Sequence, residues 1–207
     1  KDPLVLENAR LDPGRWRFAV LSDTHLVSTD PEGIETQLTR RALRQIRAER
    51  PAFAVVAGDL VDVAQPGEFE FAKRVLAEEL GSPPPFPVHV VPGNHERDPQ
   101  STGTLDNFRA AGLGPTRTTF DHRGVRFVLL DSSTGRLRTA DFSQLVDLER
   151  LLEEAVDDPA VEQVVLIAHH PVDDPLPTKN SQLGDRLEAA LIERWLTEFQ
   201  ERSGKRA

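Results

Sequence analysis

The stretch Val88–Glu96, which reads VHVVPGNHE, decides the fold of this chain. It opens with a short apolar run, Val88–Val91, and passes through a proline and a glycine into Asn94, His95 and Glu96. Short valine-rich runs bounded by Gly and Pro are typical of buried β-strands. The sequence therefore places an amide, an imidazole and a carboxylate directly after a predicted strand.

Three other apolar runs end in the same way. The polar groups are Ser22-Asp23-Thr24-His25 after Phe18–Leu21, Gly58-Asp59 after Phe53–Ala57, and His169-His170-Pro171 after Val164–Ala168. Ligands of open α/β sheets bind outside the carboxyl ends of the strands, so we expect these groups to converge on one cleft. Carboxylate, imidazole and amide groups together are typical of a metal site.

Between these runs the sequence alternates helical and strand patterns. Ile34, Leu38 and Ile46, for example, recur at helical spacing. Helices are expected at Ile34–Glu49, Phe69–Leu80, Thr104–Ala111, Phe142–Val156 and Asp185–Arg202, and strands at Trp16–Leu21, Phe53–Ala57, Val88–Val91, Thr118–Phe120, Val125–Leu130 and Val164–Ala168. This alternation indicates an α/β fold, and a hairpin around Asp121–Gly124 predicts a mixed sheet.

The composition excludes several classes of protein. The 207 residues fit one domain, at 16–207, after a lead-in or linker at 1–15. The absence of cysteine excludes disulfides and thiol chemistry, and no apolar run approaches the ~20 residues that a membrane span needs. A net charge of −9 argues against a broad nucleic-acid surface.

The four polar groups, in this order, resemble the calcineurin-like metallophosphoesterase superfamily, whose pattern is D-x-H, GD, GNH with a following acid, a lone His and G-H-x-H. The resemblance spans residues 16–171, and the fifth block is absent because no histidine follows His170. It implies a four-layer α-β-β-α sandwich with two mixed β-sheets that is incomplete at its C-terminal end. We therefore expect the chain to be part of a longer polypeptide.

The resemblance also implies a dinuclear metal centre. Asp59 would bridge two ions, Asp23 and His25 would hold the first, and Asn94 and His169 would hold the second. We prefer His169 to His170 because it lies nearer the strand end. The ions would be divalent or trivalent Mn, Fe or Zn, and the sequence leaves their identity open.

His95 would stabilise developing charge and protonate the leaving oxygen, in a reaction in which a metal-bridging hydroxide attacks the phosphate. Glu96 or Asp62 would orient the His95 ring through its other nitrogen. Arg97 is a candidate phosphate contact, and His170 is a candidate for a substrate-facing or supporting role. The two remaining histidines, at 89 and 122, are interpreted as structural.

These roles imply hydrolysis of a small phosphate ester, with a phosphodiester preferred. The run after Gly58-Asp59 lacks the arginine-glycine of Ser/Thr protein phosphatases, which argues against that activity. The alternative hypothesis is a non-catalytic phosphoesterase-like domain that binds or scaffolds. The resemblance leans toward an exported bacterial multidomain protein, and a cytoplasmic location stays open.

Overall fold

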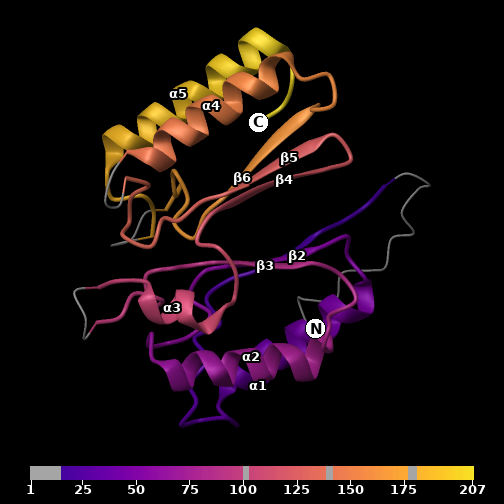
Figure 1. Cartoon of the computed structure of the whole chain (residues 1–207), viewed down its shortest axis with the longest axis vertical. Coiled ribbons are helices and arrows are strands. Elements are labelled where there is room, and N and C mark those ends of the chain that lie inside the picture. The colour runs from indigo at the N-terminus through magenta and orange to yellow at the C-terminus, as the bar shows by residue number, and fades with distance from the viewer. Residues whose placement is uncertain (1–14, 100–102, 139–141, 177–180) are drawn as a thin grey trace.

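The computed structural model describes residues 15–99, 103–138, 142–176 and 181–207, and the chain forms four layers (Figure 1). Two sheets face each other in the middle. The first contains β1 (Ala19–Leu21), β2 (Ala54–Ala57) and β3 (Val88–Val91), and the second contains β4 (Thr118–His122), β5 (Val125–Leu129) and β6 (Gln163–Ile167). Outside the first sheet lie α1 (Ile34–Glu49), α2 (Pro66–Leu80) and α3 (Asp106–Ala111), and outside the second lie α4 (Ser143–Asp157) and α5 (Arg186–Ser203).

The first sheet is parallel throughout its three strands. β2 lies in the centre, pairs with β1 and β3, and has all four residues buried, as expected for a strand covered on both faces. The carboxyl ends of the three strands therefore meet at one edge, where the polar groups follow them.

The second sheet is mixed. β4 and β5 are antiparallel, and β5 and β6 are parallel. Arg123 and Gly124, with φ of 48° and 81°, form the two-residue turn of the hairpin, shorter than the predicted Asp121–Gly124 loop because pairing continues to His122. The expected four-layer sandwich is confirmed. The expectation of two mixed sheets is correct for the second sheet and wrong for the first, whose three strands are parallel.

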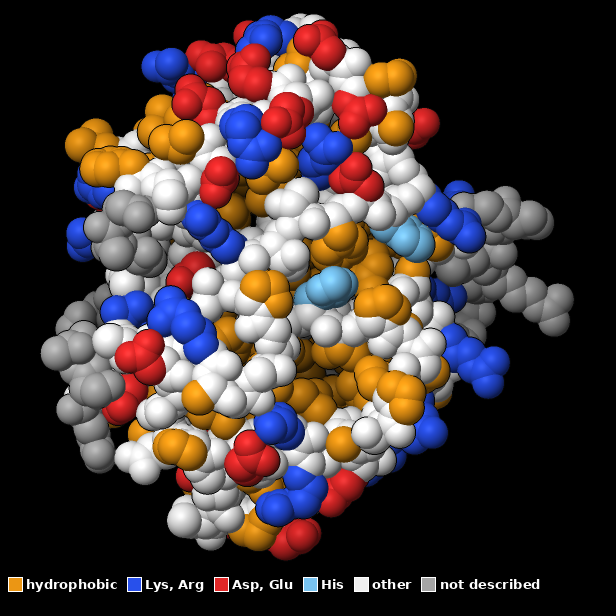
Figure 2. Space-filling view, in the orientation of Figure 1, with side chains coloured by type: hydrophobic (Ala, Val, Ile, Leu, Met, Phe, Trp, Pro, Cys, Tyr) orange, Lys and Arg blue, Asp and Glu red, His pale blue; other side chains and the backbone are white. Residues whose placement is uncertain are grey.

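Aromatic side chains fill the space between the sheets. Phe53 on one side packs edge-on against Phe127 on the other, with ring centroids 4.9 Å apart, and Phe120 stacks on Phe127 at 5.3 Å. His89 stacks on Phe120 at 4.3 Å, and His122 lies against Trp16. Both histidines thus belong to this packing, as their structural interpretation predicted. In Figure 2 the charged side chains gather over the outer helices, and apolar side chains are visible between the layers.

The observed element bounds follow from local chemistry. α1 and β3 begin and end where the sequence predicts. α2 begins three residues early, at Pro66, because proline is well suited to the first turn of a helix. α5 begins after Asp185, whose side chain accepts hydrogen bonds from the N–H groups of Leu187 and Glu188. The predicted lead-in falls almost wholly outside the described residues.

After α5 the chain turns back at Gly204, which has a φ of 69°. Arg206 then forms a parallel bridge with Gln163, and its carbonyl oxygen accepts from the N–H of Val164 at 2.9 Å. This bridge lies beside β6. The expectation that the fold is incomplete at its C-terminal end, as part of a longer polypeptide, stays a prediction. In the part of the chain that the structure describes, none of the helices combines the length and the apolar character needed to cross a membrane.

The packing of His89 predicts a pH-dependent stability. Burial lowers the pKa of His89 below its ordinary value of 6.5, so the folded protein favours the neutral ring. This stabilisation is present above the unfolded pKa of about 6.5 and is lost as the pH falls from there through the lower pKa of the folded state. In urea titrations, His89→Phe should keep the stacking and show a shallower fall in the free energy of unfolding than the wild type. Equal pH slopes in both proteins would contradict this role.

Candidate metal centre

The loops after four strands meet at one edge of the sandwich. Asp23 and His25 follow β1, Asp59 follows β2, Asn94 follows β3, and His169 follows β6 of the second sheet. Backbone hydrogen bonds join the first two loops, from Asp23 N to Gly58 O at 3.1 Å and from His25 N to Asp59 O at 3.0 Å. The structure thus brings together the five residues that the sequence nominated as ligands.

The backbone at this edge is strained. Asp23, His25 and Asp59 have φ of 55°, 43° and 51°, a left-handed conformation that non-glycine residues rarely adopt. Each such residue costs about 1–3 kcal/mol, and such costs cluster at active sites and ligand clamps. Three nominated ligands share this conformation, which indicates that the loops are shaped for their side chains.

The Asp59 carboxylate lies at the centre of the site. Its side chain is buried, and Oδ1 accepts from His95 N at 2.9 Å. Oδ2 lies 3.3 Å from His169 Nε2 and 3.7 Å from His25 Nε2. Asp59 therefore faces ring nitrogens that arrive from two directions.

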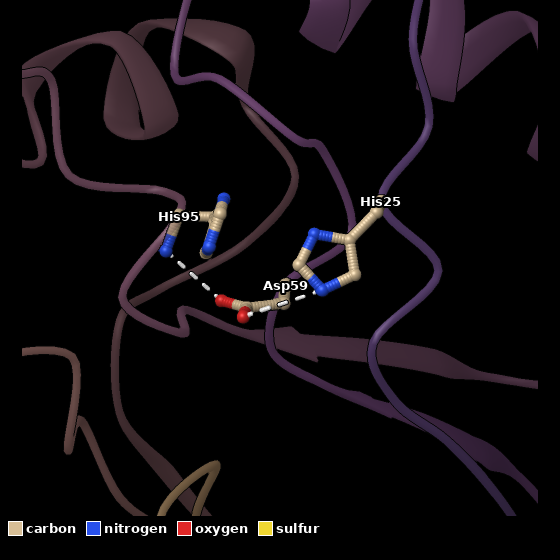
Figure 3. A group of neighbouring side chains, drawn as sticks. All are labelled: His25, Asp59 and His95. Carbon is tan, nitrogen blue, oxygen red and sulfur yellow. Dashed lines mark hydrogen bonds and ion pairs between the residues drawn. The ribbon is translucent and has the colours of Figure 1, made fainter. Parts of the chain in front are cut away.

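Two groups of possible ligand atoms share Asp59. One contains His25, Asp59 and His95, which converge in Figure 3, and the other contains Asp23, Asp59 and His169. In each group the atoms lie within 4.8 Å of one another. Asp23 also lies 4.0 Å from His25 Nε2, so its carboxylate is within reach of either group.

The histidine rings are held so that one nitrogen faces the centre. Nδ1 of His169 lies 3.0 Å from the carbonyl oxygen of Ala57 and must donate to it, because a carbonyl only accepts. Its Nε2 is then unprotonated in the neutral ring and lies 3.2 Å from Asn94 Oδ1 and close to Asp59. Metal-binding histidines are commonly fixed in this way.

Asp62 holds the other two rings. Its carbonyl oxygen accepts from His95 Nδ1 at 2.6 Å, and its carboxylate oxygen lies 3.3 Å from His25 Nδ1. The His25 and His95 rings are nearly perpendicular, with centroids 4.6 Å apart. Of the two residues offered for orienting His95, Asp62 is the one that contacts its ring, through the backbone carbonyl oxygen rather than the carboxylate, whose Oδ1 lies 3.7 Å from His95 Nδ1.

Neighbouring charges set the ionisation of Asp59 and His169. Burial alone would raise the pKa of Asp59, but the hydrogen bonds from His169 and from His95 N lower it below its ordinary value. Burial opposes protonation of His169, yet the Asp59 carboxylate raises its pKa overall. Asp59 is therefore held as an anion, the form that a cation requires.

Two glycines allow this close approach. A Cβ on Gly93 would lie 2.2 Å from Asp59 Oδ1, and a Cβ on Gly58, whose φ is +88°, would lie 2.6 Å from His169 Nδ1. Both distances are shorter than real contacts of a Cβ atom. The site thus requires glycine at both positions.

Glu96 has a different role from the one expected. It is fully buried, and its carboxylate accepts from the N–H groups of Asp59, Leu60 and Gly93 at 2.8, 2.9 and 2.7 Å and of Val61 at 3.2 Å. Burial raises the pKa of Glu96, against the effect of these N–H groups. The expectation that Glu96 orients His95 is wrong because both carboxylate oxygens are engaged by backbone.

His170 and Arg97 lie beside the centre rather than in it. The buried His170 ring places Nδ1 3.3 Å from Ser132 Oγ, and that hydroxyl accepts from His170 N at 2.8 Å. Burial lowers the pKa of His170. Arg97 donates to Ser133 Oγ at 3.3 Å. Sequence reasoning missed Ser132 and Ser133, which follow β5, because no motif marks them.

A sequence model of the calcineurin-like phosphoesterase family matches residues 17–202. This chain belongs to that family. Glycerophosphodiester phosphodiesterase GpdQ from Enterobacter lignolyticus is 30% identical to it over 167 residues, which cover 71% of this chain and 52% of that protein. The chain thus spans about half the length of this curated relative. A dimetal phosphatase from Danio rerio shares the fold, with a TM-score of 0.57 and 21% identity, over 86% of this chain and 76% of the other.

The Gly93 contact gives a sharp test of the site. Gly93→Ala should force Asp59 away and destabilise the protein by about 1–3 kcal/mol, as overpacked sites do. It should also weaken metal binding, measured by calorimetry. Gly67→Ala is the matched control, because a Cβ there meets nothing within 4 Å. If both variants bind metal as the wild type does, the close approach of Gly93 to Asp59 is unimportant.

Proposed function

We propose that this member of the calcineurin-like phosphoesterase family is a dinuclear metal-dependent hydrolase of a phosphodiester. The observation that carries the proposal is the position of Asp59 between two groups of donor atoms, because one carboxylate with two oxygens can serve two cations. The relative named as a glycerophosphodiester phosphodiesterase supports a diester rather than a monoester.

The residues present fit such a centre. Asp23, His25 and Asp59 would hold one cation, and Asp59, Asn94 and His169 the other, a set of carboxylate, imidazole and amide donors that suits Mn, Fe or Zn. The held Nδ1 atoms of His25 and His169 leave Nε2 facing inward. When bound, the two cations supply positive charge that polarises the ester phosphate and acidifies water.

His95 would supply the proton for the leaving oxygen. Its backbone N is fixed on Asp59 and its Nδ1 on the carbonyl oxygen of Asp62, so its Nε2 can exchange a proton with substrate. The ring also lies within the group formed with His25 and Asp59.

The non-catalytic alternative requires fewer features of the site than hydrolysis does. A domain that only binds or scaffolds has no need of strained ligand loops, an anionic buried Asp59 and a held His95. All of these are present together. They favour turnover over a scaffold role.

Metal dependence is the first test. Chelation followed by dialysis should abolish hydrolysis of bis(4-nitrophenyl) phosphate, and Mn²⁺, or Fe with Zn²⁺, should restore it. Asp59→Ala should be the most damaging ligand change and should lose metal from both sites. Asp106→Ala, an exposed acid on α3, is the control. Two tightly held metals in Asp59→Ala would contradict the bridging role.

The role of His95 is tested by separating binding from turnover. His95→Ala should keep metal content near normal and lower kcat by about 10²–10⁴-fold, the usual contribution of a positioned proton donor. The defect should shrink for diesters with better leaving groups, which need less protonation. The control is His89→Phe, whose ring lies between the sheets. Loss of metal from His95→Ala would instead identify His95 as a ligand.

A further inference from the structure

A polar pocket of about 550 Å³ opens beside the metal centre. Asn94 lines the pocket and lies 3.2 Å from His169 of the centre, and His170 in the pocket wall packs its ring against the ring of His169. The rest of the wall includes Arg97, Ser133 and Arg136, contributed by loops of both sheets. A substrate whose phosphate lies at the centre can therefore extend an ester arm into this space.

Among the described residues, those that line the pocket include two with guanidinium groups and none with a carboxylate. Arg97 donates to the Ser133 hydroxyl, and in the described residues neither Arg97 nor Arg136 forms an ion pair with an acid. Elsewhere in this acidic chain arginines are commonly neutralised, as Arg126 is by Asp121 and Asp158. Positive charge is thus concentrated in the pocket.

The remaining wall is also polar. Thr134 and Gln182 contribute a hydroxyl and an amide, and none of the described residues that line the pocket has an aliphatic side chain or a Phe, Tyr or Trp ring. An acyl chain would find no aliphatic side chain to pack against. Guanidinium and hydroxyl groups recognise carboxylates and phosphates instead, through charge-assisted hydrogen bonds.

We propose that this pocket is a specificity subsite in which Arg97 and Arg136 bind a second anionic group carried by one ester arm of the phosphodiester. The inference rests on the proposed function, because the scissile phosphate is placed at the metal centre. The anion is a carboxylate or a further phosphate, which share this chemistry.

Three chromogenic diesters test the subsite. They share a 4-nitrophenyl leaving group and differ in the second arm, which is pentyl, 4-carboxybutyl or 4-phosphonooxybutyl. For the wild type, the KM of at least one diester with an anionic arm should be about 10-fold or more below the KM of the pentyl diester. The arm with the lower KM identifies the anion. Arg97→Gln and Arg136→Gln should each reduce the ratio of kcat/KM between that diester and the pentyl diester.

Arg109→Gln is the matched control, since Arg109 is an exposed arginine on α3 outside the pocket. It should keep the ratio of the wild type. If the Arg97 and Arg136 variants lose kcat/KM equally on all three diesters, these residues act on the scissile phosphate, and the subsite is overturned. No preference for an anionic arm in the wild type would also overturn it.

A binding experiment separates this inference from the proposed function. Calorimetry of the Mn²⁺-loaded protein should show at least one of 5-phosphonopentanoate and 4-(phosphonooxy)butylphosphonate binding about 10-fold more tightly than pentylphosphonate, with the difference lost in Arg136→Gln. This result without hydrolysis of any diester would support the subsite and reject the enzyme. Hydrolysis with equal binding of all three phosphonates would support the enzyme and reject the subsite.

Discussion

The buried Glu96 carboxylate holds together two of the loops on which the site is built, those after β2 and β3. It accepts from three successive N–H groups after β2 and from Gly93 after β3, so the ends of two parallel strands are tied to one side chain. Left without an acceptor, these buried donors would each cost about 1–3 kcal/mol. The position of Asp59 therefore depends on a residue that faces away from the centre.

This anchoring explains how the loops tolerate their strained backbone. Asp59 keeps a φ of 51° while its N–H is bound by Glu96 and its carbonyl oxygen accepts from His25 N. Each loop thus fixes its neighbour. The side chains of Asp23, His25 and Asp59 can then converge at short distances without the backbone relaxing into a commoner conformation.

The sequence predicted most of the fold and the convergence of the nominated ligands because both are encoded locally. Strand ends, turn glycines and the residues that follow them are adjacent in the chain, as in Val88–Glu96. The role of Glu96 could not be predicted, because three of its four partners lie 35 to 37 residues away. The pocket around Arg136 was missed for a similar reason, since its wall is assembled from loops of both sheets. The choice of His169 over His170 agrees with the structure, where the contact with Ala57 turns the His169 ring toward Asp59.

His169 is the one nominated ligand that comes from the second sheet, whereas the others follow strands of the first. A cation held by His169 and Asp59 would therefore cross-link the two halves of the sandwich at one end, while the aromatic rings of Phe53 and Phe127 join them farther inside. The five nominated ligands come together only when the two sheets are packed against each other. Binding of a cation by them would therefore be thermodynamically linked to sheet packing, so that each would favour the other.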